Sequence, residues 1–159
     1  MTYSPELKGT CEAAKIAPFV VPYMQGRSVD IGSGPGKVWP SAIGIDPGSD
    51  KGRPWTDIAA DGTRLDMFAD KSLDCVFSSF LLHLFEPAEV EDILAEWATK
   101  LKIGGYLALY LPDRAQVPEG YPSKWLPSAG DIESAIRRTG AGWKIVESEV
   151  RSDGDEYAL

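Results

Sequence analysis

The stretch Ser28-Val29-Asp30-Ile31-Gly32-Ser33-Gly34-Pro35-Gly36, followed by Ile43-Gly44-Ile45-Asp46, decides the fold class of this chain. It predicts a short buried strand over 28–31, a glycine-rich loop, and a second short strand over 42–45 that the acid Asp46 closes. Glycines let the backbone approach a ligand, and an acid at the tip of the next strand can bind both ribose hydroxyls. The combination favours a site for a nucleoside.

The glycine spacing separates two classes of nucleotide ligand. A dinucleotide fingerprint has glycines at the first, third and sixth loop positions, so that a helix N-terminus holds a pyrophosphate. Here the glycines are Gly32, Gly34 and Gly36, and Lys37 takes the sixth position. Asp30 disfavours a pyrophosphate, but it can accept hydrogen bonds from an ammonium group. The spacing therefore argues against a nicotinamide or nucleotide-sugar enzyme.

The composition is that of an ordinary globular chain. Its 159 residues, 43% of them hydrophobic and 25% charged, predict a single domain over 1–159 with one sizeable core. Without a membrane-length apolar run or a signal-peptide profile, a cytoplasmic protein is expected. The net charge of −8 disfavours nucleic acid as a partner. Cys11 and Cys75 are expected to be buried small hydrophobes, and a single histidine argues against a metal site.

Strands alternate with helices along the rest of the chain, which predicts a doubly wound, mostly parallel α/β fold. An N-terminal helical segment, residues 1–26, is expected to hold a helix from Ser4-Pro5 to about Ala17 that stops before Pro18. Further elements are expected as strands near 57–60, 73–77, 106–111 and 143–150, and as helices over 86–101 and 128–140, with Gly104-Gly105 ending the first of these helical units.

Two connections depart from a regular α/β pattern. The segment from Gly32 to Ser41 is too short for a normal crossover helix, so a shortened crossover with only a turn is expected. After a hairpin at Asp153-Gly154, the last strand would run antiparallel from Glu156. The brevity of that strand suggests that the natural chain continues beyond Leu159.

The pattern Asp30-x-Gly32-x-Gly34-x-Gly36 resembles the first motif of class I S-adenosylmethionine (SAM) dependent methyltransferases, of the small methyltransferase type 11-like kind. The resemblance spans roughly residues 28–159. It implies a Rossmann-like, three-layer α/β/α domain whose last, antiparallel strand inserts into the sheet. It also implies S-adenosyl-L-methionine as cofactor and S-adenosyl-L-homocysteine as product, bound by Asp30, Gly32, Ser33, Gly34, Gly36, Asp46, Asp61, Gly62, Ser78 and Ser79.

The resemblance also implies roles for individual residues. In the family, the acid matching Asp46 holds the ribose hydroxyls, and the acid matching Asp61 reads adenine with the next backbone amide. The loop matching Ser78-Ser79 lies beside the methyl group. Each position has a plainer interpretation: Asp46 as a solvated acid, Asp61 as the cap of a turn with Gly62, and the serines as ordinary loop residues.

His83 is the only histidine and the candidate general base. The apolar run over 80–85 favours instead a hydrogen-bonded structural role. Methyl transfer depends mainly on placing the nucleophile in line, so the lack of an obvious base does not argue against it. The loop over 112–127 is either a packed surface loop or one wall of an acceptor site, with candidate lining residues Tyr110, Asp113, Tyr121 and Trp125.

The sequence therefore predicts an enzyme that transfers a methyl group from SAM to an oxygen or nitrogen nucleophile. The acidic charge favours a small molecule, a sugar or glycan, or a protein as acceptor. Because no cap domain is evident, a partner domain or a homo-oligomer could complete the acceptor site. The alternative is a noncatalytic SAM-binding module that supports a partner enzyme.

Overall fold

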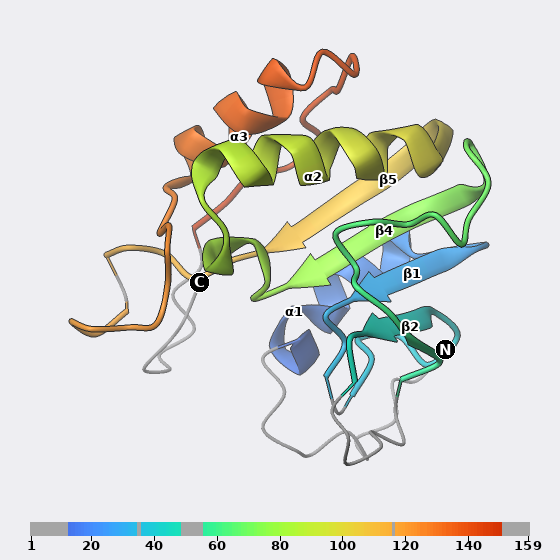
Figure 1. The fold of residues 1–159 in the computed structure, drawn as a ribbon, viewed down its shortest axis with the longest axis horizontal. Helices are drawn as coiled ribbons and strands as arrows, with labels where there is room; N and C mark the ends of the chain where they lie inside the picture. Colours follow the sequence, from blue (N-terminus) through green and yellow to red (C-terminus); the bar gives the residue numbers. More distant parts are fainter. Residues whose placement is uncertain (1–12, 35, 49–55, 116, 151–159) are drawn as a thin grey trace.

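The protein is described by a computed structural model for residues 13–34, 36–48, 56–115 and 117–150. Five parallel strands form one sheet in the order β3-β2-β1-β4-β5 (Figure 1). This confirms the predicted doubly wound, mostly parallel fold. The elements are β1 (Ser28–Ile31), β2 (Ile43–Asp46), β3 (Ile58–Ala59), β4 (Leu73–Ser79), β5 (Leu101–Tyr110), α1 (Ala13–Val20), α2 (Pro87–Lys100), α3 (Ala129–Arg138) and the 3-10 turns η1 (Val21–Tyr23) and η2 (Leu82–Leu84).

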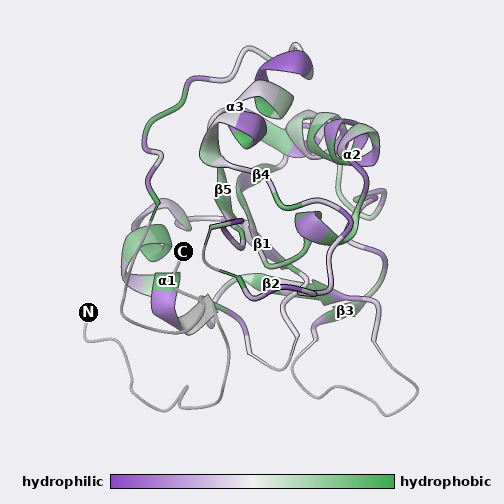
Figure 2. Ribbon diagram, turned by 90° about the vertical axis from the view of Figure 1, so that its left-hand side faces the viewer, coloured by the Kyte–Doolittle hydropathy of each residue, from purple (hydrophilic) through white to green (hydrophobic). Residues whose placement is uncertain are grey.

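Helices cover both faces of the sheet, as the predicted three-layer arrangement requires. Helix α1 lies on one face, and α2 and α3 lie on the other (Figures 1 and 2). Strand β4 shows how alternation supplies both cores. Its Val76 packs with the α2 and α3 side, whereas Cys75 and Phe77 pack with the α1 side. Burial also raises the pKa of the Cys75 thiol to about 12, which makes it the inert apolar residue that the sequence predicted.

The first crossover is reduced to turns, which confirms the prediction for this connection. Apart from Pro35, residues 32–42 are described and contain no helix. A single side chain ties the shortened connection to the neighbouring strands. Lys37 Nζ donates to the carbonyl of Ala42 at 2.9 Å and to Asp57 Oδ2 at 2.8 Å. The same Asp57 oxygen accepts the amide of Gly44 at 2.7 Å.

The end of the N-terminal helix was predicted wrongly. Helix α1 continues through Pro18 and ends at Val20, while its predicted start lies outside the described residues. Proline removes one backbone donor from a helix. Here Ile16, Ala17 and Val20 are buried against the sheet, and this packing outweighs the lost hydrogen bond.

The boundary between α2 and β5 also differs from the prediction. Helix α2 forms as expected, with Glu86 and Glu89 making a reciprocal capping box at its start. Strand β5, however, already begins at Leu101 and includes Gly104-Gly105. Leu73 pairs with Leu101 but Cys75 pairs with Tyr106, so the β5 strand bulges between these two positions. The glycines therefore permit a bulge rather than ending the unit.

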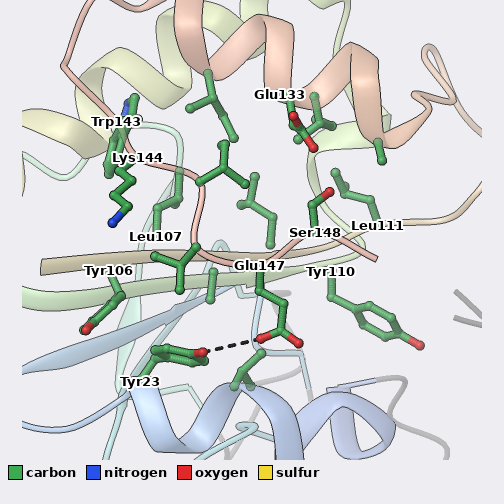
Figure 3. Close-up of a pocket in the computed structure, with 18 of the residues that line it drawn as sticks. Tyr23, Tyr106, Leu107, Tyr110, Leu111, Glu133, Trp143, Lys144, Glu147 and Ser148 are labelled. Carbon is green, nitrogen blue, oxygen red and sulfur yellow. Dashed lines mark hydrogen bonds between the residues drawn. The ribbon is translucent and has the colours of Figure 1, made fainter. Parts of the chain in front are cut away.

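The prediction of a strand over 143–150 is wrong. The segment has no regular structure and lies beside β5 across a groove of about 790 Å³ (Figure 3). Its alternating sequence suits a strand, but a strand also needs a hydrogen-bonded neighbour, and β5 does not pair with this segment. A hydrogen bond between side chains spans the groove: the Tyr23 hydroxyl donates to Glu147 Oε2 at 3.4 Å. The predicted antiparallel last strand lies outside the described residues.

None of the helices in the described part of the chain is long and apolar enough to span a bilayer.

Candidate functional site

The glycine loop is fastened to the end of β2. Gly32 has a φ of +73° and Gly34 a φ of +55°, a region that favours glycine. The Gly32 amide donates to the carbonyl of Ile45 at 2.7 Å, and the Gly34 amide donates to Asp46 Oδ2 at 3.1 Å. The Gly36 amide also donates to the carbonyl of Ser33 at 3.2 Å. The structure thus brings the loop and the acid together at the carboxyl edge of the sheet.

Asp46 is half-buried and forms the centre of this edge. Its Oδ2 accepts from Gly34, and its Oδ1 accepts the amide of Gly48 at 3.2 Å. Both contacts orient the carboxylate at the end of β2. A carboxylate held in this way is suited to accept hydrogen bonds from ribose hydroxyls.

The loop next to Asp46 has features that fit a bound nucleoside. The hydroxyl of Ser33 is buried and has no hydrogen-bond partner among the described residues. A Cβ added at Gly34 would meet nothing nearer than the carbonyl of Gly32, at 4.0 Å, so the space above the loop is open. An unpartnered buried hydroxyl and an open glycine are what a polar ligand lying on the loop would use.

Asp30 lies beneath the loop and is almost completely buried. Its Oδ2 accepts the amide of Val38 at 2.7 Å. Burial raises the pKa of Asp30 to about 7, although the Val38 amide and the charge of Lys37 act in the opposite direction. In this structure the carboxyl group therefore anchors the far side of the glycine loop.

Asp61 and Gly62 occupy a turn after β3. Asp61 is exposed, and its Oδ1 accepts the amide of Thr63 at 2.9 Å, which is the turn-capping geometry. Gly62 is buried, and a Cβ there would overlap the side chain of Ile31. Its carbonyl accepts the indole N–H of Trp97 at 2.8 Å, which links this turn to α2.

Ser78 and Ser79 were placed in a loop by the sequence, but they are the last two residues of β4. Ser78 is buried, and its hydroxyl donates to the carbonyl of Ile31 at 3.2 Å. Ser79 is half-buried and pairs with Tyr110 on β5. The loop interpretation is wrong because the ladder with β5 extends β4 beyond the apolar run that marked it.

His83 lies on η2, just after β4, and only 4% of it is exposed. Its Nδ1 has no hydrogen-bond partner among the described residues, and burial lowers the pKa of its imidazole. Aromatic side chains surround it, with the Phe80 ring centroid at 6.0 Å and the Tyr121 centroid at 5.5 Å. The expectation of a hydrogen-bonded side chain is therefore not met at Nδ1.

Sequence reasoning missed three contributors to this edge. Lys37 and Asp57 lock the shortened crossover, and Phe80 adopts a φ of +51° at the end of β4. The sequence shows that the crossover containing Lys37 is short. A crossover without a helix requires side-chain hydrogen bonds to hold it, and this could have pointed to Lys37. Nothing in the local pattern around Phe80 indicates its backbone conformation.

A parallel sheet with a glycine loop after β1 and an acid after β2 defines the class of Rossmann-like nucleoside-binding domains. Residues 29–109 match the family described as methyltransferase domain. The chain belongs to this family, which confirms the resemblance seen in the sequence. No curated protein matches the chain.

Solved structures share the fold at low sequence identity. A SAM-dependent methyltransferase from Archaeoglobus fulgidus is 20% identical with a TM-score of 0.68, over 80% of this chain and 66% of that one. A putative methyltransferase of Haloferax volcanii, in complex with the Trm112 activator, is 20% identical with a TM-score of 0.61, over 80% and 68%. The 1,6-didemethyltoxoflavin-N1-methyltransferase of Burkholderia thailandensis, with bound 1,6-didemethyltoxoflavin and S-adenosylhomocysteine, is 15% identical with a TM-score of 0.59, over 80% and 67%.

Proposed function

We propose that this chain binds S-adenosylmethionine at the carboxyl edge of β1 and β2 and transfers its methyl group to an oxygen or nitrogen nucleophile. The observation that carries the proposal is the hydrogen bond from the Gly34 amide to Asp46 Oδ2, which joins the glycine loop to the acid. Bound SAM supplies a methyl group on a positively charged sulfur, which a nucleophile can displace directly. Family membership supports the same reaction.

The residues of this edge would divide the cofactor between them. Asp46 would accept the ribose hydroxyls, and the hydroxyl of Ser33 and the backbone of Gly34 would contact the ligand from the loop. Asp61 and the Gly62 amide would read the adenine edge from the turn after β3. Asp30 and Ser78 would act from below, because hydrogen bonds of their side chains already hold the loop and the neighbouring strand.

The acceptor is a small molecule, a sugar or glycan, or a protein in this proposal. The neighbour from Burkholderia thailandensis has bound 1,6-didemethyltoxoflavin, and the neighbour from Haloferax volcanii is in complex with the Trm112 methyltransferase activator. Both kinds of arrangement are compatible with a chain of this size. The proposal treats residues 1–159 as one domain that provides the cofactor site by itself.

Calorimetry with S-adenosylhomocysteine, SAM and NAD tests the cofactor. We expect the first two to bind and NAD to bind weakly or not at all. We expect Asp46→Ala to weaken S-adenosylhomocysteine binding at least about tenfold, because a carboxylate hydrogen bond is worth about 1.5–3 kcal/mol. Asp66→Ala is the control, since its side chain is 73% exposed. Unchanged affinity in Asp46→Ala, with both variants folded by circular dichroism, would place the ribose elsewhere.

A further inference from the structure

Four rings lie side by side along the carboxyl ends of β4 and β5. Their centroids are separated by 5.5 Å from Tyr121 to His83, 6.0 Å from His83 to Phe80, and 5.3 Å from Phe80 to Tyr110. Backbone hydrogen bonds fix the row. The Phe80 amide donates to the carbonyl of Tyr110 at 2.8 Å, and the carbonyl of His83 accepts the amide of Lys124 at 2.9 Å. The loop over 112–127 is thereby attached directly to η2.

The backbone of Phe80 is strained. Its φ of +51° lies in the left-handed region, which a residue with a bulky side chain rarely adopts. Strained backbone of this kind is concentrated at functional sites. Here it occurs where the chain leaves β4, on the same sheet edge as the glycine loop. A glycine would relieve the strain but would remove the ring from the row.

The Nδ1 atom of His83 is buried in this row and has no hydrogen-bond partner among the described residues. A buried nitrogen without a partner is unfavourable unless a ligand supplies the missing donor. Burial lowers the pKa of the His83 imidazole and thereby favours its neutral form. A neutral imidazole can accept one hydrogen bond at its unprotonated nitrogen.

Three charged side chains of the neighbouring loop have partners within the protein. They pair as follows: Asp113 Oδ1 with the amide of Ala115 at 2.7 Å, the Arg114 guanidinium with the carbonyl of Leu126 at 2.9 Å, and Lys124 with Glu89 at 3.7 Å. The net charge of −8 further disfavours an anionic acceptor. The row therefore offers a ligand aromatic surface together with the Nδ1 atom of His83.

We propose that the methyl acceptor is an uncharged aromatic or heteroaromatic ring with a hydroxyl or ring N–H, bound against Phe80 and Tyr121, and that His83 accepts the hydrogen bond of that group. This inference rests on the proposed methyl transfer and names its substrate class. Aromatic side chains favour a planar ring through edge and face contacts. The His83 nitrogen fixes which atom of the ring is presented for reaction.

The proton balance agrees with this arrangement. The acceptor oxygen or nitrogen forms a bond to the methyl carbon, and the electron pair of the broken carbon–sulfur bond stays on sulfur. One proton leaves the acceptor for each methyl transferred. The neutral imidazole of His83 takes that proton and passes it to solvent.

Turnover with labelled SAM on a matched set of acceptors tests the substrate class. 2-Naphthol and benzimidazole present a hydroxyl and a ring N–H on an uncharged aromatic ring. Decahydro-2-naphthol keeps the hydroxyl without the aromatic ring, and 6-hydroxy-2-naphthoate adds a negative charge. We expect methylation of the first two and at least about tenfold lower kcat/KM for the other two. Comparable or higher activity on the saturated or anionic compound would overturn the proposal.

Three variants test the residues. We expect His83→Leu to lower kcat on 2-naphthol by roughly 10²- to 10⁴-fold, the usual contribution of a positioned proton acceptor, with unchanged affinity for S-adenosylhomocysteine. His83→Gln keeps a hydrogen-bond acceptor but cannot take up the proton. Its KM for 2-naphthol should therefore stay near the wild-type value, while its kcat should be as low as that of His83→Leu. Tyr121→Leu should raise KM about three- to tenfold with little change in kcat, the size of one ring contact.

The outcomes separate this inference from the function on which it rests. If the wild-type protein does not bind S-adenosylhomocysteine, the proposed function fails. If it binds but methylates none of the aromatic probes, the substrate class is wrong. If His83→Leu retains wild-type turnover, the role of His83 is wrong. Lys124→Ala is the control within the loop, because the Lys124 side chain pairs with Glu89 on α2. This variant should leave S-adenosylhomocysteine binding, kcat and KM unchanged.

Discussion

The buried carboxyl group of Asp30 should make folding stability depend on pH in a direction opposite to that of most carboxylates. Burial raises the pKa of Asp30 from its usual 3.8 to about 7. Between these values the folded protein holds a proton that the unfolded chain has lost, so the free energy of unfolding falls as pH rises. About three pKa units at 1.36 kcal/mol each correspond to about 4 kcal/mol lost between pH 4 and pH 8.

Asp30→Asn removes this titration while keeping an oxygen that can accept the Val38 amide. We expect urea unfolding at intervals from pH 4 to pH 8 to show that the free energy of unfolding of the variant rises relative to that of the wild type, by about 4 kcal/mol over this range. The difference between the two proteins isolates Asp30, because other groups titrate in both. Asp66→Asn makes the same chemical change at an exposed position and serves as the control for the substitution itself. Parallel profiles for Asp30→Asn and the wild type would refute a raised pKa.

Two further predictions concern the turn after β3, which a hydrogen bond from Trp97 links to α2. Gly62→Ala should lower the free energy of unfolding by about 1–3 kcal/mol because its Cβ overlaps Ile31. Gly130→Ala on α3, whose Cβ would meet Ser128 Oγ at an ordinary contact distance of 3.8 Å, should leave the free energy of unfolding unchanged or raise it by up to about 1 kcal/mol. Equal effects in thermal melts would contradict this. Trp97→Phe should lower the free energy of unfolding by about 1–3 kcal/mol, because it leaves the buried carbonyl of Gly62 unpaired. Trp143→Phe, which changes a half-buried indole, should lower it less when both variants are unfolded with urea.

The parts of the fold that the sequence predicted well are those specified by local chemistry. Ser128 and Asp131 hydrogen-bond to each other's backbone amides at the start of α3, as their spacing indicates. The parts that failed depend on distant neighbours. Whether residues 143–150 form a strand depends on pairing with β5, and whether α1 passes Pro18 depends on packing against the sheet. Neither partner is encoded near the segment in question.

The same distinction separates the residues of the candidate site. The sequence locates Asp46 and the glycines correctly at the ends of β2 and β1, because a strand–loop–strand pattern fixes them. It does not reveal that Ser78 donates to Ile31 or that Gly62 accepts the indole N–H of Trp97. Those partners arise from sheet order and turn geometry, which only the folded chain determines.

The residues of the glycine motif and its neighbouring strand end affect both stability and ligand affinity, and substitutions must be chosen to separate the two effects. Asp30 holds the loop from beneath through Val38, and a change there acts on stability first. Asp46 orients its carboxylate through the amides of Gly34 and Gly48, and these contacts lie at the surface where a ribose would bind. A substitution of Asp46 is thus expected to lower the affinity for the cofactor without lowering stability. A substitution of Asp30 is expected to change stability before it changes affinity. Measuring affinity and stability on variants of both residues therefore tests whether Asp46 is the ligand-binding acid and Asp30 the structural one.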